Sequence, residues 1–211
     1  TSNMLKLGKL FFNNFKKTKI EQKNILIPID IVDDLDRDIK SQFYNYCEYK
    51  FNNLKKIKLF NFNKSELADC FRVIQGYEIK LNILPWIKKY DPKISNEINY
   101  RFEMAESITK SMYNHAVDMR KEFISEIDHN LPFDSFLIFP TTPFSAPIKG
   151  QSDKNLAKLR KKAMEFTCVG GLLSRPQINI PKFTGKTGPI GLSVLGNKNT
   201  DEIILNNLNF F

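Results

Sequence analysis

Apolar runs along the chain predict strands that lie inside a sheet. Residues Asn24 to Ile31 (NILIPIDI) are almost wholly apolar, as in a strand that is covered on both faces. Pro28 within this run indicates a strand end or an edge position, because proline cannot donate to the sheet. Asp134 to Phe139 (DSFLIF) is a second run of the same type, and Lys56 to Phe62 (KIKLFNF) alternates as a strand does.

Two further strands are predicted near the end of the chain. They cover Gln177 to Pro181 and Pro189 to Leu195. Gly185 to Gly188 lies between them and is typical of a hairpin loop.

Apolar residues at steps of three or four predict helices between these strands. The longest prediction is one continuous amphipathic helix that follows Ser95, runs from Ile98 to Ile127 and is closed by Pro132. Pro85 should end or kink the helix before it. The other predicted helices have apolar faces within residues 39–54, 67–79, 156–163 and 204–208. Strands that alternate with long helices predict a mixed α/β architecture.

Composition fits one globular domain or a large piece of one, since the chain has 211 residues and is 42% hydrophobic. We expect no transmembrane helix and no signal peptide, and the chain begins with Thr1 rather than Met, as a processed or truncated chain would. Three widely spaced cysteines, Cys47, Cys70 and Cys168, predict reduced thiols in a cytoplasmic protein, without a disulfide framework or a metal site.

A net charge of +9 raises the question of a nucleic-acid partner. The sequence has only six scattered arginines, and lysine supplies the rest of the positive charge. Arginine is the side chain that suits planar contacts to phosphate and guanine. We therefore expect solvated lysines, with neither a nucleic acid nor a membrane as partner.

Several short motifs imitate catalytic or binding sites. Gly185-Lys186-Thr187 lacks the upstream glycine of a phosphate-binding loop, and Ser193 lies inside a predicted strand rather than at a strand-to-helix turn. Neither of the two histidines, His115 and His129, is near a plausible serine, cysteine or carboxylate partner in sequence. From residue chemistry alone the chain is an α/β protein or fragment without an evident active site, metal or cofactor.

Four segments change this interpretation, because in this order they resemble the amidase-signature enzymes. Phe139–Pro147 (FPTTPFSAP) resembles the family's PTxPxxAP segment, and Phe166–Pro181 (FTCVGGLLSRPQINIP) resembles the segment that follows it. Gly188–Gly196 (GPIGLSVLG) is similar to a strand of the family, and Asn199–Glu202 (NTDE) begins the usual terminal helix. With looser upstream agreement, the resemblance covers residues 22–211.

The resemblance implies an amide-bond hydrolase with a mixed central sheet flanked by helices. It also implies that residues 1–211 are the C-terminal portion of a single domain. The family's catalytic lysine, bridging serine and nucleophilic serine lie in a Gly/Ser-rich region that precedes the matched part. No such segment occurs among these 211 residues, which hold nine glycines, so no catalytic residue is assigned. The implied partners are a small-molecule amide and the missing N-terminal part, with a homodimer left open.

The wall of the substrate pocket is what this part can contribute. Thr142 and Phe144 follow a predicted strand end, where ligand-facing groups of α/β sheets often lie, so we predict them at the substrate. Cys168 and Gly171 are predicted to approach it as well, since glycines permit close backbone contact. Packed turns and helix contacts are the alternative for all four. Trp86 could line an entrance or be a partly buried anchor.

Two other functions stay open at this point. One is a non-catalytic scaffold or binding protein that kept only this part of the fold. The other is a fragment of an amidotransferase A-type chain, although Gly170-Gly171 and Ser174-Arg175 depart from the residues common in that group.

Overall fold

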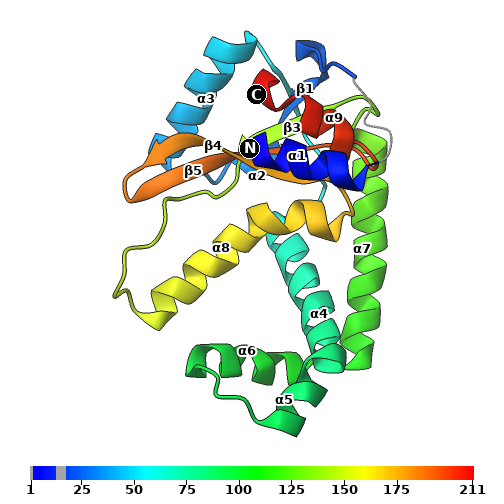
Figure 1. The fold of residues 1–211 in the computed structure, drawn as a ribbon, viewed down its shortest axis with the longest axis vertical. Helices are drawn as coiled ribbons and strands as arrows, with labels where there is room; N and C mark the ends of the chain where they lie inside the picture. The colour runs from blue at the N-terminus through cyan, green and yellow to red at the C-terminus, as the bar shows by residue number, and fades with distance from the viewer. Residues whose placement is uncertain (1, 13–17) are drawn as a thin grey trace.

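One mixed sheet organises the protein in the computed structural model, which describes residues 2–12 and 18–211. The strand order is β2-β1-β3-β5-β4 (Figure 1). β1 runs parallel to β2 and β3, whereas β5 is antiparallel to β3 and β4. The predicted α/β fold with a mixed central sheet is confirmed. The strands are β1 (Ile25–Pro28), β2 (Lys55–Ile57), β3 (Phe136–Pro140), β4 (Gln177–Gly185) and β5 (Gly188–Leu195).

Helices cover both faces of this sheet and extend beyond it. Two of them, α5 and α6, lie at the far end of the molecule from the sheet (Figure 1). The helices are α1 (Ser2–Phe11), α2 (Ile29–Val32), α3 (Arg37–Phe51), α4 (Lys64–Asn82), α5 (Leu84–Tyr90), α6 (Asn96–Glu106), α7 (Lys110–Asn130), α8 (Asp153–Leu172) and α9 (Asp201–Asn206), with short 3-10 turns at Gln22–Asn24 and Leu208–Phe210.

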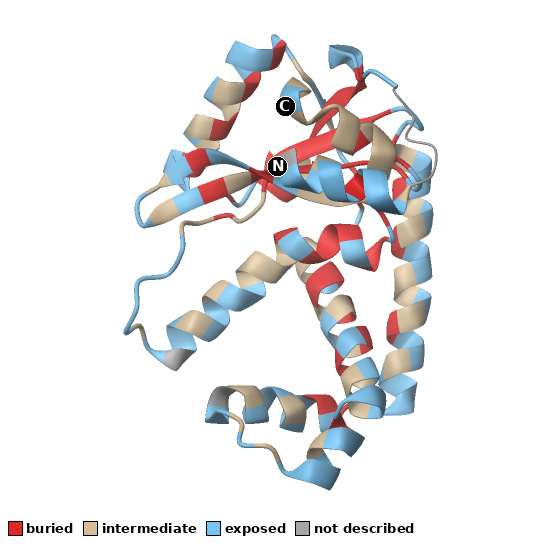
Figure 2. Ribbon diagram, viewed as in Figure 1, coloured by how far each residue is buried: buried red, intermediate tan, exposed pale blue. Residues whose placement is uncertain are grey.

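The alternation of side chains along β3, β4 and β5 divides the helices between the two faces. Phe183, paired with Ile190 of β5, points to the face that α3 covers, where its ring lies 6.3 Å from that of Phe43. Gln177 points to the opposite face, where it accepts a hydrogen bond from the backbone of Gly170 in α8. The core consists of the sheet and the helix surfaces turned towards it, which Figure 2 shows as buried.

β1 confirms the first predicted strand. All four of its residues are buried, because strands lie on both sides of it and helices cover its faces. Pro28 pairs with Ile57 and is the last residue of the strand. Of the two positions that the proline indicated, the strand end is therefore correct and the edge is not.

The prediction of one helix from Ile98 to Ile127 is wrong, because the chain forms α6 and α7 with a break at residues 107–109. Apolar spacing continues across the break, from Ala105 through Ile108 to Met112, so the pattern did not reveal it. The Thr109 hydroxyl accepts a hydrogen bond from the Met112 amide at 3.2 Å and caps the new helix. Ile108 is buried against α4, which turns α6 away from the α7 axis.

Other boundaries shifted in ways that local chemistry explains. β2 covers only three residues and ends at Ile57, since Leu59 and Phe60 of the predicted strand donate their amides to the Asp30 carboxylate instead of to a sheet. α4 is capped by Asn63, whose partner is Glu66, rather than by Ser65. The predicted hairpin and terminal helix are confirmed. Helix α1 was not predicted.

Candidate functional site

A row of polar side chains crosses the otherwise apolar sheet face beneath α8. Gln177 and Asn179 alternate on β4, and Asn179 is paired with Ser193 of β5. Thr141 follows the last residue of β3 and donates its backbone amide to the Gly191 carbonyl at 2.8 Å, which extends the pairing by one residue. The period of two along each strand therefore brings the polar residues of three strands to one face.

These side chains form a directed chain of hydrogen bonds. The Gly170 amide donates to Gln177 Oε1 at 3.0 Å, and Gln177 Nε2 donates to Ser193 Oγ at 2.9 Å. The Thr141 hydroxyl donates to Asn179 Oδ1 at 2.6 Å, so its single proton is engaged there. The Ser193 hydroxyl, 3.0 Å from Thr141 Oγ1, therefore donates to Thr141. The row therefore links β4, β5, the residue after β3 and the last turns of α8.

Ser193 is not an activated nucleophile in this arrangement. Its side chain is buried, and the groups that hydrogen-bond to it are the Gln177 amide and the Thr141 hydroxyl rather than a base. Activation of serine needs an adjacent group that can accept its proton. The interpretation of Ser193 as a serine on one face of a strand is confirmed, since it lies within β5.

Thr142 and Phe144, the two predicted substrate residues after β3, lie in a loop that is tied to itself and to α3. The Thr142 hydroxyl donates to the Phe144 carbonyl at 2.9 Å, and both side chains are half-buried. The Pro143 carbonyl accepts the amide of Asp36 at the start of α3, at 2.9 Å. These hydrogen bonds give the loop a defined shape. Contact of Thr142 and Phe144 with a substrate stays a prediction.

The α8 residues predicted to approach the substrate, Cys168 and Gly171, differ in exposure. Cys168 is 2% exposed, whereas Gly171 is exposed. A Cβ atom on Gly171 would lie 3.8 Å from Phe71, which is an ordinary contact, so close approach does not demand glycine there. The neighbouring Gly170 does demand it, because its Cβ would lie 2.7 Å from both Gln177 Cβ and Gln177 Oε1. Of the four predicted residues, Gly171 lines the pocket at the end of α8 that is described next, and contact of any of them with a substrate stays a prediction.

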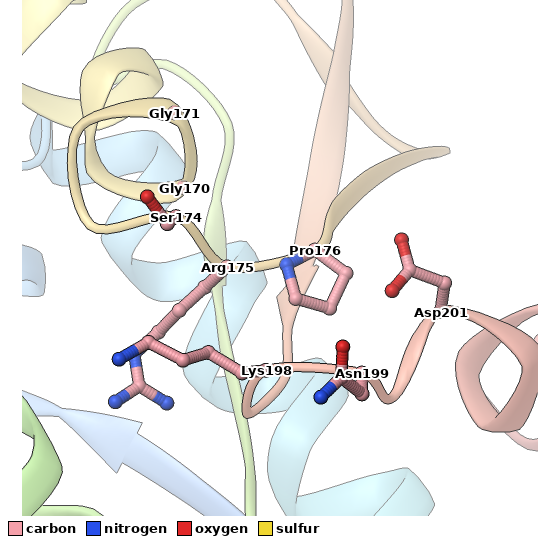
Figure 3. A pocket seen from close by; sticks show the side chains of 8 residues that line it. All are labelled: Gly170, Gly171, Ser174, Arg175, Pro176, Lys198, Asn199 and Asp201. Carbon is pink, nitrogen blue, oxygen red and sulfur yellow. The ribbon is translucent and has the colours of Figure 1, made fainter.

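A surface pocket of about 480 Å³ lies where α8 ends and α9 begins (Figure 3). Lys198 extends towards the Arg175 guanidinium in this view, and Asp201 lies on the other side. The Arg175 side chain is buried and binds Asp128 and Asn197, and Lys198 pairs with Asp128 at 3.1 Å. These charges join α7, the α8–β4 turn and the β5–α9 turn, so we assign the pocket a structural role. Its lining residues are Gly170, Gly171, Ser174, Arg175, Pro176, Lys198, Asn199 and Asp201.

A larger groove of about 810 Å³ runs between α4, α6 and α8. Gly76 of α4 makes room for the Ile108 side chain that follows α6, since a Cβ atom there would lie 2.4 Å from Ile108 Cδ1. At the rim, Asp69 is paired with Arg72 at 3.6 Å and with Lys161 at 3.5 Å. An apolar concave wall with polar groups at its edge is the usual form of a small-molecule site. The apolar wall comprises Ala68, Gly76, Ile79, Met104, Ala105, Ile108, Ala157, Ala163 and Met164.

Neither the groove nor the polar row was identified from sequence. A sequence pattern could have indicated the polar row, because Gln177, Asn179 and Ser193 are polar residues next to apolar positions of predicted strands. The groove left no such pattern, because its walls come from three helices that are far apart in the sequence.

Lys64, whose side chain is largely covered, is a further candidate for acid–base chemistry. It donates to the Ile31 carbonyl at 3.1 Å and pairs with Asp34 at 3.0 Å, and its side chain is 9% exposed. Burial raises the pKa of nearby Glu165. Its contacts with Ile31 and Asp34 link α4 to the end of α2, and neither of them involves a serine hydroxyl. Among the described residues, no group of three or more His, Cys, Asp and Glu side chains could hold a metal ion.

Thiol reactivity provides a first test of the site. Burial raises the pKa of Cys47 and Cys168 to about 12 and that of Cys70 to about 11. We expect no reaction of these thiols with a disulfide reagent at pH 8 until the chain is unfolded by guanidinium. Because each folded pKa lies above the unfolded value, their contribution to stability is complete below pH 9 and is lost as the pH rises towards 12. A thiol that reacts at once in the native chain would contradict this description.

Comparison with known proteins finds an amidase among proteins similar in sequence to this chain. No family model matches the chain. It is 24% identical over 139 residues to Amidase 1 of Arabidopsis thaliana, which is 66% of this chain and 33% of that protein. Cys168 and the polar row belong to the segments on which the predicted resemblance was based.

Solved structures extend the likeness to nearly the whole chain. A crystal structure of an amidase matches 93% of this chain and 46% of its own length, with a TM-score of 0.79 and 16% identity. The A subunit of glutamyl-tRNA(Gln) amidotransferase from Thermotoga maritima matches 90% of this chain and 42% of its own length, with a TM-score of 0.67 and 18% identity. A bacterial aryl acylamidase of the amidase-signature family matches 92% of this chain and 43% of its own length, with a TM-score of 0.63 and 11% identity.

The chain thus spans about a third of the curated relative and less than half of each of these structures. No helix of the described residues is long and apolar enough to cross a membrane. The predicted resemblance is confirmed: the chain is similar in sequence to an amidase and has the fold of the C-terminal portion of amidase-signature enzymes.

Proposed function

We propose that this chain is the non-catalytic C-terminal part of an enzyme that hydrolyses non-peptide amide bonds. The observation that carries the proposal is its likeness to amidases over less than half of their length. The polar row agrees with it, because the described hydroxyl groups of that row are committed to hydrogen bonds and lack a base.

In the complete enzyme, we expect the reactive groups to come from the N-terminal part. A neutral lysine there would take a proton through a bridging serine and so activate the nucleophilic serine. That serine would attack the amide carbonyl, backbone amides would stabilise the oxyanion, and the amine would leave. Water would then release the acyl group. None of these steps uses a residue of this chain.

The role of this chain would be to bind and orient the amide. We expect the groove between α4, α6 and α8 to receive the apolar portion of the substrate, since its wall is apolar and concave. Thr142 and Phe144, which do not line this groove, would contact another portion of the substrate where β3 ends. The polar row would fix the sheet face against which the N-terminal part packs.

Assay of the purified chain tests the proposal. We expect no hydrolysis of aryl and aliphatic amides above the buffer rate, with full-length Arabidopsis Amidase 1 as the positive control. We also expect no labelling by a fluorophosphonate, a reagent that modifies activated serines. Turnover or a labelled serine in the isolated chain would contradict the non-catalytic role.

The coding DNA provides an independent test. We expect an open reading frame upstream of Thr1, or a second polypeptide that co-purifies with this chain, to carry a Gly/Ser-rich segment with two serines and a preceding lysine. If neither exists, the chain is a scaffold rather than part of a hydrolase, and the proposal is wrong.

A further inference from the structure

Four large apolar side chains are exposed between the end of α4 and the end of α5. Leu81 is 58% exposed, Ile83 42%, Trp86 53% and Tyr90 58%. We call these four residues the α5 corner. Trp86 is the single tryptophan of the chain, and its ring lies 5.8 Å from that of Tyr90. Singly exposed apolar residues are common, whereas exposed apolar residues that lie together, as Trp86 and Tyr90 do, commonly mark an interaction surface.

The corner is held firmly in the fold rather than being a loose loop. Lys80 of α4 donates to the carbonyls of Glu106 and Ile108 at 2.7 and 2.8 Å, and Lys88 of α5 pairs with the Glu106 carboxylate. Leu84 is buried and anchors the start of α5. The four side chains are therefore presented to solvent from a fixed frame, at the end of the molecule opposite the sheet (Figures 1 and 2).

Positive charge is interleaved with these apolar residues. Between Ile79 and Ser95 the sequence has four lysines and one acidic residue, Asp91. Lys80 and Lys88 make the contacts given above, and Lys89 and Lys93 are the other two. Lys89 lies over the Tyr90 ring, with its Nζ atom 5.0 Å from the ring centroid. Tryptophan and tyrosine favour the boundary between hydrocarbon and water, and lysine stems bury their methylenes there while the ammonium stays at anionic headgroups.

We propose that the α5 corner docks peripherally on an anionic lipid surface, with Trp86 and Tyr90 entering the interface and Lys89 and Lys93 contacting headgroups. This goes beyond the proposed function and departs from the expectation, drawn from sequence, that no membrane is a partner. Docking of this kind needs no spanning helix. It also places the groove near the lipid surface, because Ile79 on its wall lies two residues before Leu81.

A second exposed apolar surface, on α1, provides the comparison. Its four exposed apolar residues, Met4, Leu7, Leu10 and Phe11, are 49%, 47%, 78% and 80% exposed. However, α1 has neither tryptophan nor tyrosine, and Lys6 and Lys9 are its two cations. It also lies beside α9 near the sheet rather than at the far end (Figure 1). We assign the lipid contact to the α5 corner and use α1 as the control surface.

The single tryptophan makes the test direct. The purified chain is mixed with vesicles of phosphatidylcholine alone or with added phosphatidylserine, and both co-sedimentation and Trp86 emission are recorded. We expect a blue shift and sedimentation with the anionic vesicles, little of either with the neutral ones, and loss of binding at high salt. Lys89→Gln with Lys93→Gln should weaken the partition by roughly fivefold per lysine.

Variants locate the contact while keeping the probe. Leu81→Ser with Tyr90→Ser should reduce vesicle binding by about tenfold or more, since both side chains leave the interface, whereas Leu10→Ser with Phe11→Ser should leave it unchanged. Equal thermal melting of the variants shows that the fold is intact. If the α1 variant loses binding instead, or neutral vesicles bind equally, the proposal is wrong. A blue shift that grows with protein concentration without vesicles would identify a second copy as the occupant and would overturn it too.

Discussion

Gly170→Ala should destabilise the chain by about 1–3 kcal/mol. The new Cβ atom would lie 2.7 Å from Gln177 Cβ and 3.1 Å from the Arg175 carbonyl oxygen, distances at which α8 or β4 must move. The Gly170 amide also donates to Gln177 Oε1, so the shift would strain the first bond of the polar row. Urea unfolding followed by circular dichroism measures the loss as a lower midpoint at unchanged slope.

The adjacent glycine is the matched control for this substitution. In Gly171→Ala the new methyl group meets only Phe71, at 3.8 Å, and the backbone is helical. Alanine is the better helix former by up to about 1 kcal/mol, so Gly171→Ala should be neutral or stabilising. If both substitutions cost the same, the close approach of α8 to β4 at Gly170 is not as described.

Asp128→Ala should cost about 2–4 kcal/mol of stability, because it leaves the Arg175 guanidinium buried without its counter-charge. The Arg175 side chain is 1% exposed, whereas that of Asp128 is 47% exposed, which reduces the loss below that of a fully buried pair. Burial already lowers the pKa of Arg175, and Asp128 is the group that opposes this. Asp128→Asn keeps an acceptor and should lose less.

Another aspartate of α7 tests whether the burial of the arginine causes the effect. Asp118 pairs with Lys121 at 2.8 Å, with both side chains largely exposed, so Asp118→Ala should leave the unfolding midpoint unchanged. Adding Arg175→Met to Asp128→Ala should recover much of the loss, since no charge then stays buried. A large effect of Asp118→Ala, or no recovery in the double variant, would refute this account.

Short-range chemistry explains which elements could be read from the sequence. β1 and β3 are apolar runs because strands flank them and helices cover them. A run of this kind can be recognised in the sequence without knowing which elements pack against it. The hairpin of β4 and β5 is closed by Gly185 and Gly188, a local signal that needs no distant partner. These were predicted correctly for that reason.

Errors arose where a distant contact decides the local structure. The break between α6 and α7 leaves the apolar period intact, and what turns the chain there is the space that Gly76 leaves for Ile108. β2 ends early because the Asp30 carboxylate, from another element, takes the amides of Leu59 and Phe60. Periodicity contains no information about either partner.

The sequence by itself determined the α/β class, the strands of the core and, through four ordered segments, the likeness to amidase-signature enzymes. Those features depend on residues close together in the chain. Only the tertiary structure decided that Gly170 rather than Gly171 requires glycine, that Arg175 is buried against Asp128, and that α4, α6 and α8 enclose a groove. Each depends on the distance between segments far apart in sequence, which packing sets and which no local pattern records.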